Sequence, residues 1–165
     1  MPYLKEFRLP RPGDRGETQI IQDVLQYGWH VLGVSADPGK TDPPFSYSIG
    51  LYYTFGHPEV VITGLPHKTA HSIINAVVER LQSVGPFVPN VRTGQVLEAH
   101  DIVMRQVSPE LYPPYLGYAM WFYRDISSEF PALQVVWPDK GGRFPWEPGF
   151  DPSLLSSQFM LDVSA

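Results

Sequence analysis

The segment Gly56-His57-Pro58-Glu59 holds the residue types best suited to acid–base chemistry. An imidazole and a carboxylate that converge on one substrate can serve as general acid and general base. The structural alternative is that the His57 ring hydrogen-bonds the backbone and fixes the turn that Pro58 begins. Because spacing alone does not show convergence, His57 and Glu59 are catalytic candidates only.

A second candidate runs from Trp137 to Glu147, where two tryptophans flank an acidic residue, a glycine pair and an arginine. Two indoles beside carboxylates could form a stacking surface for a ligand or a protein partner. The alternative is that both indoles pack on a sheet while Asp139 caps a turn. From this segment we take as binding candidates Trp137, Asp139, Arg143, Trp146 and Glu147.

Aromatic side chains near two predicted strands complete the binding candidates, which are Trp29, Tyr47 and Tyr52. In the segment FSYSIGLYY, strand alternation places Tyr47 on one face and the two neighbouring serines on the other. One of these faces must belong to the core, and the other could line a pocket with hydroxyl groups.

A histidine pair, His67 and His71, would share one face of a helix because four positions separate them. The intervening glutamate of zinc proteases is missing, no third ligand stands nearby, and the sequence has no cysteine. We therefore expect no metal site. Isolated glycines without a glycine-rich motif give no support to a nucleotide-binding loop.

Length, charge and hydropathy limit the kinds of partner that we expect for this protein. The 165 residues match one domain, with a net charge of −5 and scattered basic residues, so we expect no nucleic acid partner. No apolar run reaches the ~18 residues of a membrane helix. The first residues are charged and proline-rich, unlike an export signal, so we expect a cytoplasmic protein without a membrane partner. A homodimer is the common default at this size.

The elements that must position these side chains follow from periodicity and turn residues. We expect an extended arm over 1–16 and a tail over 151–165. Apolar spacing predicts helices over 18–27, from Pro66 to the stop at Gly85, and over 115–124. Runs rich in β-branched and aromatic residues predict strands over 29–35, 45–53, 60–63, 101–107 and 133–137, with a further short strand possible within 86–98.

Strands grouped around a few helices predict an α+β fold. We expect one domain over 1–165, with a mostly antiparallel, barrel-like sheet and two to three packed helices. The first two strands should form a hairpin with a long loop, and the run Val60-Val61-Ile62-Thr63 should be buried on both faces.

Three separated blocks carry a family resemblance. They are Gly28-Trp29, the stretch FSYSIGLYYTFGHPEVVITGL over 45–65, and the stretch LQVVWPDKGGRFPWEPGF over 133–150. Together they resemble the bacterial family catalogued as domain of unknown function 4262. The resemblance implies a small bacterial domain of the fold described above, with no activity that carries over residue by residue.

Two function classes remain. The first is a non-catalytic binding or interaction module, of immunity or regulatory type, that captures a basic protein through the acidic aromatic surface near Trp137, Asp139, Trp146 and Glu147. The alternative is an enzyme or cofactor binder whose sheet holds a small molecule, such as a flavin in a split-barrel pocket, with His57 and Glu59 at its mouth. The cofactor, if any, is left open by the sequence.

Overall fold

A computed structural model describes residues 1–35 and 42–162, and its core is one mixed six-stranded sheet. The strands are β1 (His30–Val34), β2 (Phe45–Ile49), β3 (Glu59–Thr63), β4 (Arg92–Thr93), β5 (Ile102–Gln106) and β6 (Ala132–Val136). The α-helices are α1 (Arg15–Tyr27), α2 (Leu51–Phe55), α3 (His67–Ser83), α4 (Tyr112–Tyr115) and α5 (Gly117–Phe122). Short 3-10 turns cover Pro109–Leu111, Arg124–Ile126 and Pro152–Leu154.

The strand order is β1-β2-β3-β6-β5-β4, so β1 and β4 lie at opposite edges of the sheet. Every neighbouring pair is antiparallel except β3 and β6, which run parallel with Val61 opposite Gln134. The α+β class and the hairpin of β1 and β2 are confirmed. The barrel is wrong, because the sheet stays open and its edge strands do not pair.

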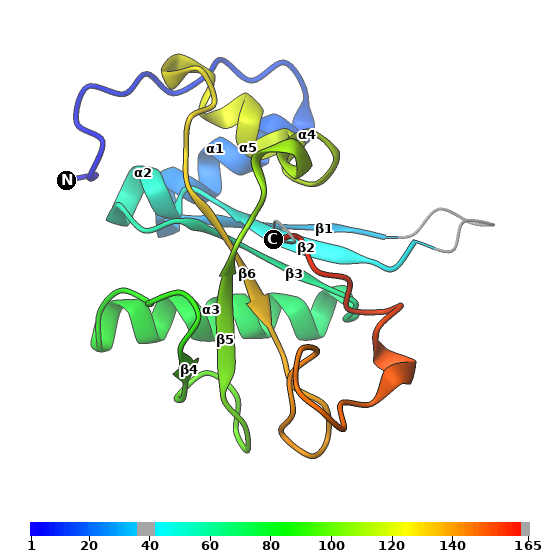
Figure 1. Cartoon of the computed structure of the whole chain (residues 1–165). Helices are drawn as coiled ribbons and strands as arrows, with labels where there is room; N and C mark the ends of the chain where they lie inside the picture. The colour runs from blue at the N-terminus through cyan, green and yellow to red at the C-terminus, as the bar shows by residue number, and fades with distance from the viewer. Residues whose placement is uncertain (36–41, 163–165) are drawn as a thin grey trace.

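Helices cover both faces of the sheet, so it can bury its apolar side chains without closing into a barrel. Helix α3 lies along one face, and α1, α4 and α5 gather on the other (Figure 1). The sheet twists strongly, since β5 and β6 run down the view of Figure 1 whereas β1, β2 and β3 run across it. Helices that cover both faces bury the apolar side chains that a barrel would enclose.

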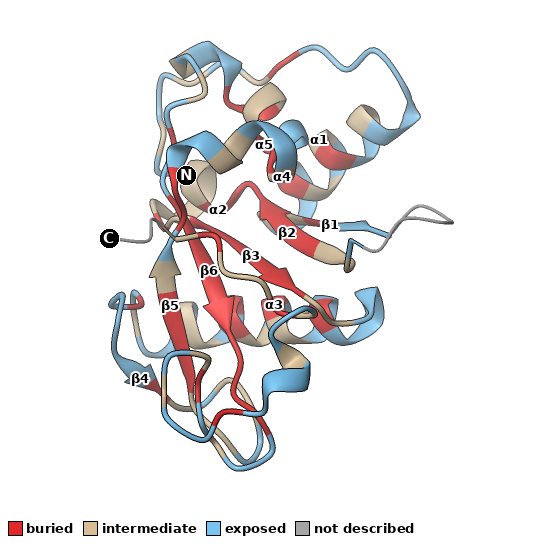
Figure 2. Ribbon diagram, turned by 45° about the vertical axis from the view of Figure 1, so that its right-hand side comes forward, coloured by how far each residue is buried: buried red, intermediate tan, exposed pale blue. Residues whose placement is uncertain are grey.

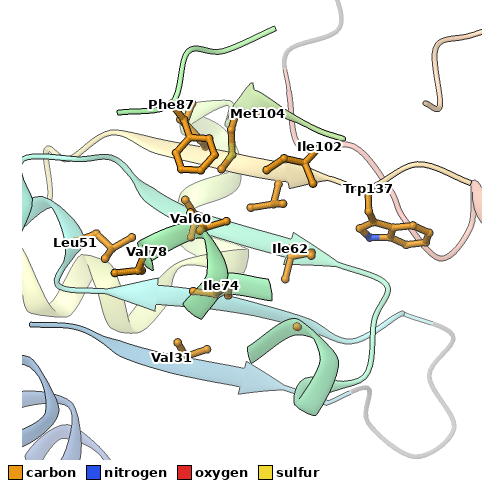
Figure 3. Packing of buried hydrophobic residues seen from close by; sticks show 14 residues of the cluster. Val31, Leu51, Val60, Ile62, Ile74, Val78, Phe87, Ile102, Met104 and Trp137 are labelled. Atoms are coloured by element: carbon orange, nitrogen blue, oxygen red, sulfur yellow. The ribbon is translucent and has the colours of Figure 1, made fainter. Parts of the chain in front are cut away.

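Strand alternation divides the core into layers. In β3, Val60 and Ile62 point to the α3 side, while Val61 packs with the α1 and α5 side. All five residues of β3 are buried, which confirms the strand buried on both faces. Figure 2 shows the buried residues concentrated in the central strands, and Figure 3 shows the cluster between the sheet and α3.

The predicted strand over 45–53 is wrong in its second half. Strand β2 ends at Ile49, and Leu51–Phe55 forms the short helix α2. Gly50 makes the change of direction with a φ of 112°, a region that favours glycine. The backbone N–H groups of Gly50, Leu51 and Tyr52 then donate to the Glu59 carboxylate. A distant acceptor on β3 thus decides where this strand stops.

Most other elements form where the sequence places them, but the extended arm over 1–16 is too long, because α1 begins at Arg15 after its Asp14 cap. The described residues also form five α-helices, two of them short turns of four or five residues, where two to three were expected. Helix α3, the strand over 102–106 and the short strand β4 all form where the sequence places them. The predicted helix over 115–124 starts earlier and is divided, because α4 ends at Tyr115 and α5 begins at Gly117.

Candidate functional site

Three elements meet at the β1 edge of the sheet and border a half-open pocket of about 330 Å³, in which His71 and Asn75 remain exposed to solvent. Helix α1 reaches this edge from one face and α3 from the other. We call this cavity the edge pocket, and its lining consists of Asp23, Tyr27, Trp29, His30, Val31, His71 and Asn75. Its volume falls at the lower end of small-molecule sites, and its lining combines aromatic rings with a few polar groups, as such sites do.

A helix end brings the first two polar groups together. Helix α1 stops at Gly28, whose left-handed backbone (φ 103°) turns the chain directly into β1. The turn places His30 beside Asp23 of the helix, with His30 Nδ1 2.7 Å from Asp23 Oδ2. The second oxygen of Asp23 accepts from Gln19 at 2.8 Å. An ionised carboxylate only accepts hydrogen bonds, so the Nδ1 atom of His30 donates to Asp23. The other ring nitrogen, Nε2, is left to interact with a ligand.

Helix α3 supplies the opposite wall. His71 and Asn75 are four residues apart and therefore project from one face of the helix. Asn75 Oδ1 accepts the indole N–H of Trp29 at 3.2 Å, and the Trp29 ring packs against Phe55. These two contacts fix the indole at the pocket wall. Tyr27 stands at the rim, where 61% of its surface is exposed.

His71 on α3 lies in the electrostatic field of the neighbouring histidines. Burial lowers the pKa of His71, and the positive potentials of His67 and His30 lower it further. His71 is therefore a neutral hydrogen-bonding group at neutral pH. The His67 ring lies against that of His71, and its Nδ1 is 3.2 Å from the buried Ser46 hydroxyl.

Chemically, the edge pocket offers one carboxylate, two imidazoles, one amide and two aromatic rings. An imidazole oriented by a carboxylate can accept or donate a proton, and the rings can stack on an apolar portion of a ligand. The pocket therefore has the groups needed to bind and orient a small polar molecule.

His57 lies elsewhere, in the loop that enters β3. The side chain is buried against Phe87, and its Nδ1 is 2.8 Å from the carbonyl oxygen of Pro58. Its Nε2 is buried without a hydrogen-bond partner among the described residues. Burial lowers the pKa of His57, so the ring is neutral at neutral pH. This contact with Pro58 is the turn-fixing bond that the sequence offered as the structural alternative.

Glu59 is completely buried and serves as a hub of hydrogen bonds. Its carboxylate accepts from the Ser48 hydroxyl at 2.7 Å, from the three N–H groups that begin α2, and from the Tyr123 hydroxyl. Burial raises the pKa of Glu59, while the hydrogen bonds from Tyr123, Ser48 and the backbone oppose that rise. Among the described contacts, His57 and Glu59 are not hydrogen-bonded to each other.

Trp137 is packed in the core, and Asp139 is engaged within its own turn. Trp137 is buried on the α3 side, and its indole N–H donates to the Thr63 carbonyl at 2.9 Å. Asp139 accepts from three backbone N–H groups, those of Gly141, Arg143 and Asp151. These bonds, led by that from Arg143, lower the pKa of Asp139 and make the carboxylate the organiser of the turn.

Trp146 lies on the opposite face of the sheet from Trp137. Its ring stacks on Phe144 with centroids 5.3 Å apart, and the Arg105 guanidinium sits 3.9 Å from its centroid. Phe144 belongs to a small cluster with Val103 and Val136, away from α3. Trp146 keeps 43% of its surface exposed.

The charged neighbours of Trp146 are paired. Glu147 forms an ion pair with Arg92 at 2.5 Å and accepts the N–H of Phe144. The N–H of Phe144, with help from Arg92, lowers the pKa of Glu147. The exposed Arg143 reaches the Gly149 carbonyl at 3.4 Å. The surface around Trp146 therefore carries arginines as well as acids.

The two tyrosine candidates pack on the α1 and α5 side. The buried Tyr47 hydroxyl accepts the N–H of Tyr118 at 3.1 Å, and burial raises the pKa of Tyr47 to about 12. Tyr52 is half-buried, with its ring against those of Tyr3 and Tyr123.

The predicted catalytic residue His57 and the predicted binding residue Trp137 lie at opposite ends of β3. His57 precedes the start of β3, whereas Trp137 bonds to Thr63 at its end, six positions or roughly 20 Å further along a strand. In Figure 3, Phe87, which packs on His57, and Trp137 lie at opposite ends of the cluster. The structure does not bring these residues into one cleft.

Of the residues singled out as binding candidates, Trp29 lines the edge pocket. Sequence reasoning noticed His71 only as part of a possible metal pair, and it missed Asp23, Tyr27, His30 and Asn75. The useful signal was a carboxylate near the end of a helix, followed by a glycine stop and the pair Trp29-His30 at the start of a strand.

The described residues, 1–35 and 42–162, contain neither a metal-binding cluster nor a membrane-spanning helix. Within them, no three histidine, aspartate or glutamate side chains are grouped in a way that would hold a metal ion. None of the helices there combines the length and apolar character of a membrane span.

Comparison with known proteins identifies the family. The model of the family described as "Domain of unknown function (DUF4262)" matches residues 23–151, which include all seven residues of the edge pocket. No curated protein and no solved structure matches the chain. The match covers most of the sequence and confirms the resemblance of the three blocks, so the chain belongs to the DUF4262 family.

Proposed function

We propose that this domain binds a small organic molecule in the edge pocket. The observation that carries the proposal is the convergence of Asp23, His30, His71 and Asn75 around the rings of Tyr27 and Trp29. These groups come from α1, the turn after it, β1 and α3. A pocket assembled from separate elements with convergent polar groups is the default candidate for a binding site.

The fixed positions of the polar groups support the proposal further. Asp23 is bound by Gln19 and His30, and the Trp29 indole is bound by Asn75, so both are oriented before a ligand arrives. Preorganised groups lose little conformational entropy on binding, which favours affinity for a small ligand.

A fragment screen followed by NMR tests this function. We expect a subset of small polar aromatic compounds to shift the indole N–H resonance of Trp29, assigned with Trp29→Phe, and to raise the melting temperature. His71→Phe should fill the pocket and abolish both effects. Gln82→Phe is the matched control, because Gln82 is exposed about three turns further along α3.

Two outcomes would contradict binding in the edge pocket. If no compound moves the Trp29 resonance, or if the compounds that do so bind His71→Phe unchanged, the edge pocket is not the binding site. Retained binding by Gln82→Phe is required for the loss in His71→Phe to be assigned to the pocket.

A second candidate, a protein-interaction module, draws support from Trp146. This half-exposed indole is held rigidly between Phe144 and Arg105, as interface anchors often are. Glu147 is already paired with Arg92 and is therefore less available to attract a basic partner. This pairing favours a partner contact made mainly through the Trp146 ring. Pull-down with Trp146→Ala, which should lose any partner retained by Arg143→Ala, tests this function.

The cofactor alternative loses its structural support, since the sheet is open and His57 and Glu59 are buried in separate contacts. A colourless purified protein whose melting temperature is unchanged by flavins would remove it.

A further inference from the structure

The charge of the edge pocket indicates the class of its ligand. Its lining includes the Asp23 carboxylate and neither lysine nor arginine. His71 is neutral at neutral pH, because burial and the neighbouring histidines lower its pKa. An anionic ligand would face Asp23 without a permanent positive charge in the lining to balance it.

The aromatic groups point in the same direction. Tyr27 and Trp29 line the cavity together with Asp23, and electron-rich ring faces attract cations. The Trp29 indole is held by Asn75 and by contact with Phe55, so its ring does not need to be ordered by the ligand. Aromatic rings beside a carboxylate are the groups by which proteins recognise substituted ammonium ions.

The carboxylate is also placed for such a ligand. Asp23 lies in the last two turns of α1, between Gln19 and His30, and each of its oxygens accepts one hydrogen bond from these side chains. A carboxylate oxygen can accept further hydrogen bonds, so Asp23 can receive an ammonium group without losing its present partners.

We propose that the edge pocket binds an organic ammonium ion, with the charged group between Asp23 and the rings of Tyr27 and Trp29 and the rest of the molecule toward His71 and Asn75. This inference rests on the proposed function of the same pocket.

Isothermal titration with charged and uncharged isosteres tests the ligand class. The probes are choline and its uncharged carbon isostere 3,3-dimethylbutan-1-ol, then benzylamine with benzyl alcohol and benzoate. We expect each cation to bind at least tenfold more tightly than its uncharged counterpart, and benzoate to bind more weakly than either benzyl compound. The Trp29 indole N–H resonance should shift with each probe that binds.

Asp23→Asn provides the decisive variant, because asparagine keeps the shape and can still accept from His30. It should reduce the affinity for the cations to that of the uncharged isosteres and leave the isosteres unchanged. Glu79→Gln is the control, since Glu79 is exposed on α3 four residues beyond Asn75 and does not line the pocket. It should bind all probes as the natural protein does.

The outcomes separate this inference from the function on which it rests. Equal affinity for cations and isosteres, or tighter binding of benzoate, overturns the ammonium proposal while retaining a small-molecule pocket. Cation binding that Asp23→Asn leaves unchanged also overturns it. If none of the five probes shifts the Trp29 resonance but other compounds of the screen do, the ammonium proposal fails and the pocket binds another class of ligand. If no compound shifts the resonance, both proposals fail.

Discussion

At the scale of single residues, Glu59 shows how one buried side chain organises its surroundings. Its two oxygens accept from five donors, on β2, at the start of α2 and at the end of α5. The Tyr123 hydroxyl in turn accepts the N–H of Tyr53. Because three of the five donors are backbone N–H groups, which have no acceptor capacity, the network depends on an acceptor at this position.

Glu59→Gln should therefore be strongly destabilising despite its unchanged shape. One oxygen becomes an NH2 group that faces N–H and O–H donors, and leaving such donors unpaired costs about 1–3 kcal/mol each. We expect the free energy of unfolding to fall by about 2 kcal/mol or more, measured by urea denaturation. The same change at the exposed Glu79 should stay within about 0.5 kcal/mol. A stable Glu59→Gln protein would contradict the role assigned to this carboxylate.

At the scale of elements, hydrogen bonds at both ends fix helix α1, whose C-terminal half lines the edge pocket. Asp14 is the N-cap residue and accepts the N–H of Glu17 at 2.8 Å. The Glu17 side chain reaches back past the N-cap and accepts the N–H of Gly13 at 2.7 Å. Gly28 then ends the helix with its N–H bonded to Val24. The helix is thereby fixed at both ends, and Asp23 and Tyr27 are positioned against β1.

Asp14→Ala tests the contribution of the N-terminal cap. The substitution removes the acceptor and should lower the free energy of unfolding by about 1 kcal/mol, whereas Asp14→Ser should retain most of the stability. Chemical denaturation monitored by circular dichroism measures both. Equal losses in the two variants would show that the hydrogen bond to Glu17 is not the source of the effect.

Gly64 marks the point where β3 ends against the C-terminal segment. An added Cβ would lie 2.4 Å from the carbonyl oxygen of Ser157, and the backbone has a φ of 87°. Gly64→Ala should therefore combine backbone strain with a clash against backbone. Gly142 has a similar φ of 82°, but its Cβ would meet only the His100 ring at 3.4 Å.

We expect Gly142→Ala to cost about 1 kcal/mol, which is the strain of a left-handed alanine, and Gly64→Ala to cost at least about 1 kcal/mol more. Thermal unfolding of the two variants under identical conditions measures the difference. If both lose the same stability, the close approach of Ser157 contributes nothing.

At the scale of the whole molecule, the open sheet keeps its functional candidates apart. The edge pocket lies at β1, His57 lies at the start of β3, and Trp146 lies over β5 near the opposite edge. Each can be changed without touching the others, so the binding and interaction hypotheses are separable. The dimer expected from size stays a prediction, and sedimentation equilibrium of the purified protein tests it.

The buried His57 predicts a dependence of global stability on pH. Burial lowers its pKa in the folded state below the ordinary value of 6.5, so the unfolded state takes up a proton first as the pH falls. The stability that neutral His57 contributes is present above pH 6.5 and is lost as the pH falls below it, toward the folded-state pKa. His57→Asn should flatten the decline in the free energy of unfolding between pH 7.5 and 5.5.

Denaturation curves across that pH range measure the slope, which is independent of any constant loss of stability in the variant. An identical slope in the natural protein and in His57→Asn would show that another group titrates there.

The sequence by itself determined the elements whose causes are local. The apolar stripe and glycine stop produced α1 and α3, and continuous β-branched residues produced β3. The motif blocks likewise identified the family. Local spacing also anticipated that Asp139 would cap its turn, because its partners follow within a few residues.

Tertiary structure decided what depends on distant partners. The end of β2 at Ile49 depends on Glu59, and the open sheet depends on helices that cover both faces. The edge pocket requires α3 to meet α1 across β1, so Asn75 and Trp29 are joined over 46 positions. Patterns of neighbouring residues carry the preferences of each segment, but the pairing of segments follows from burial of the whole chain, which no single window of sequence contains.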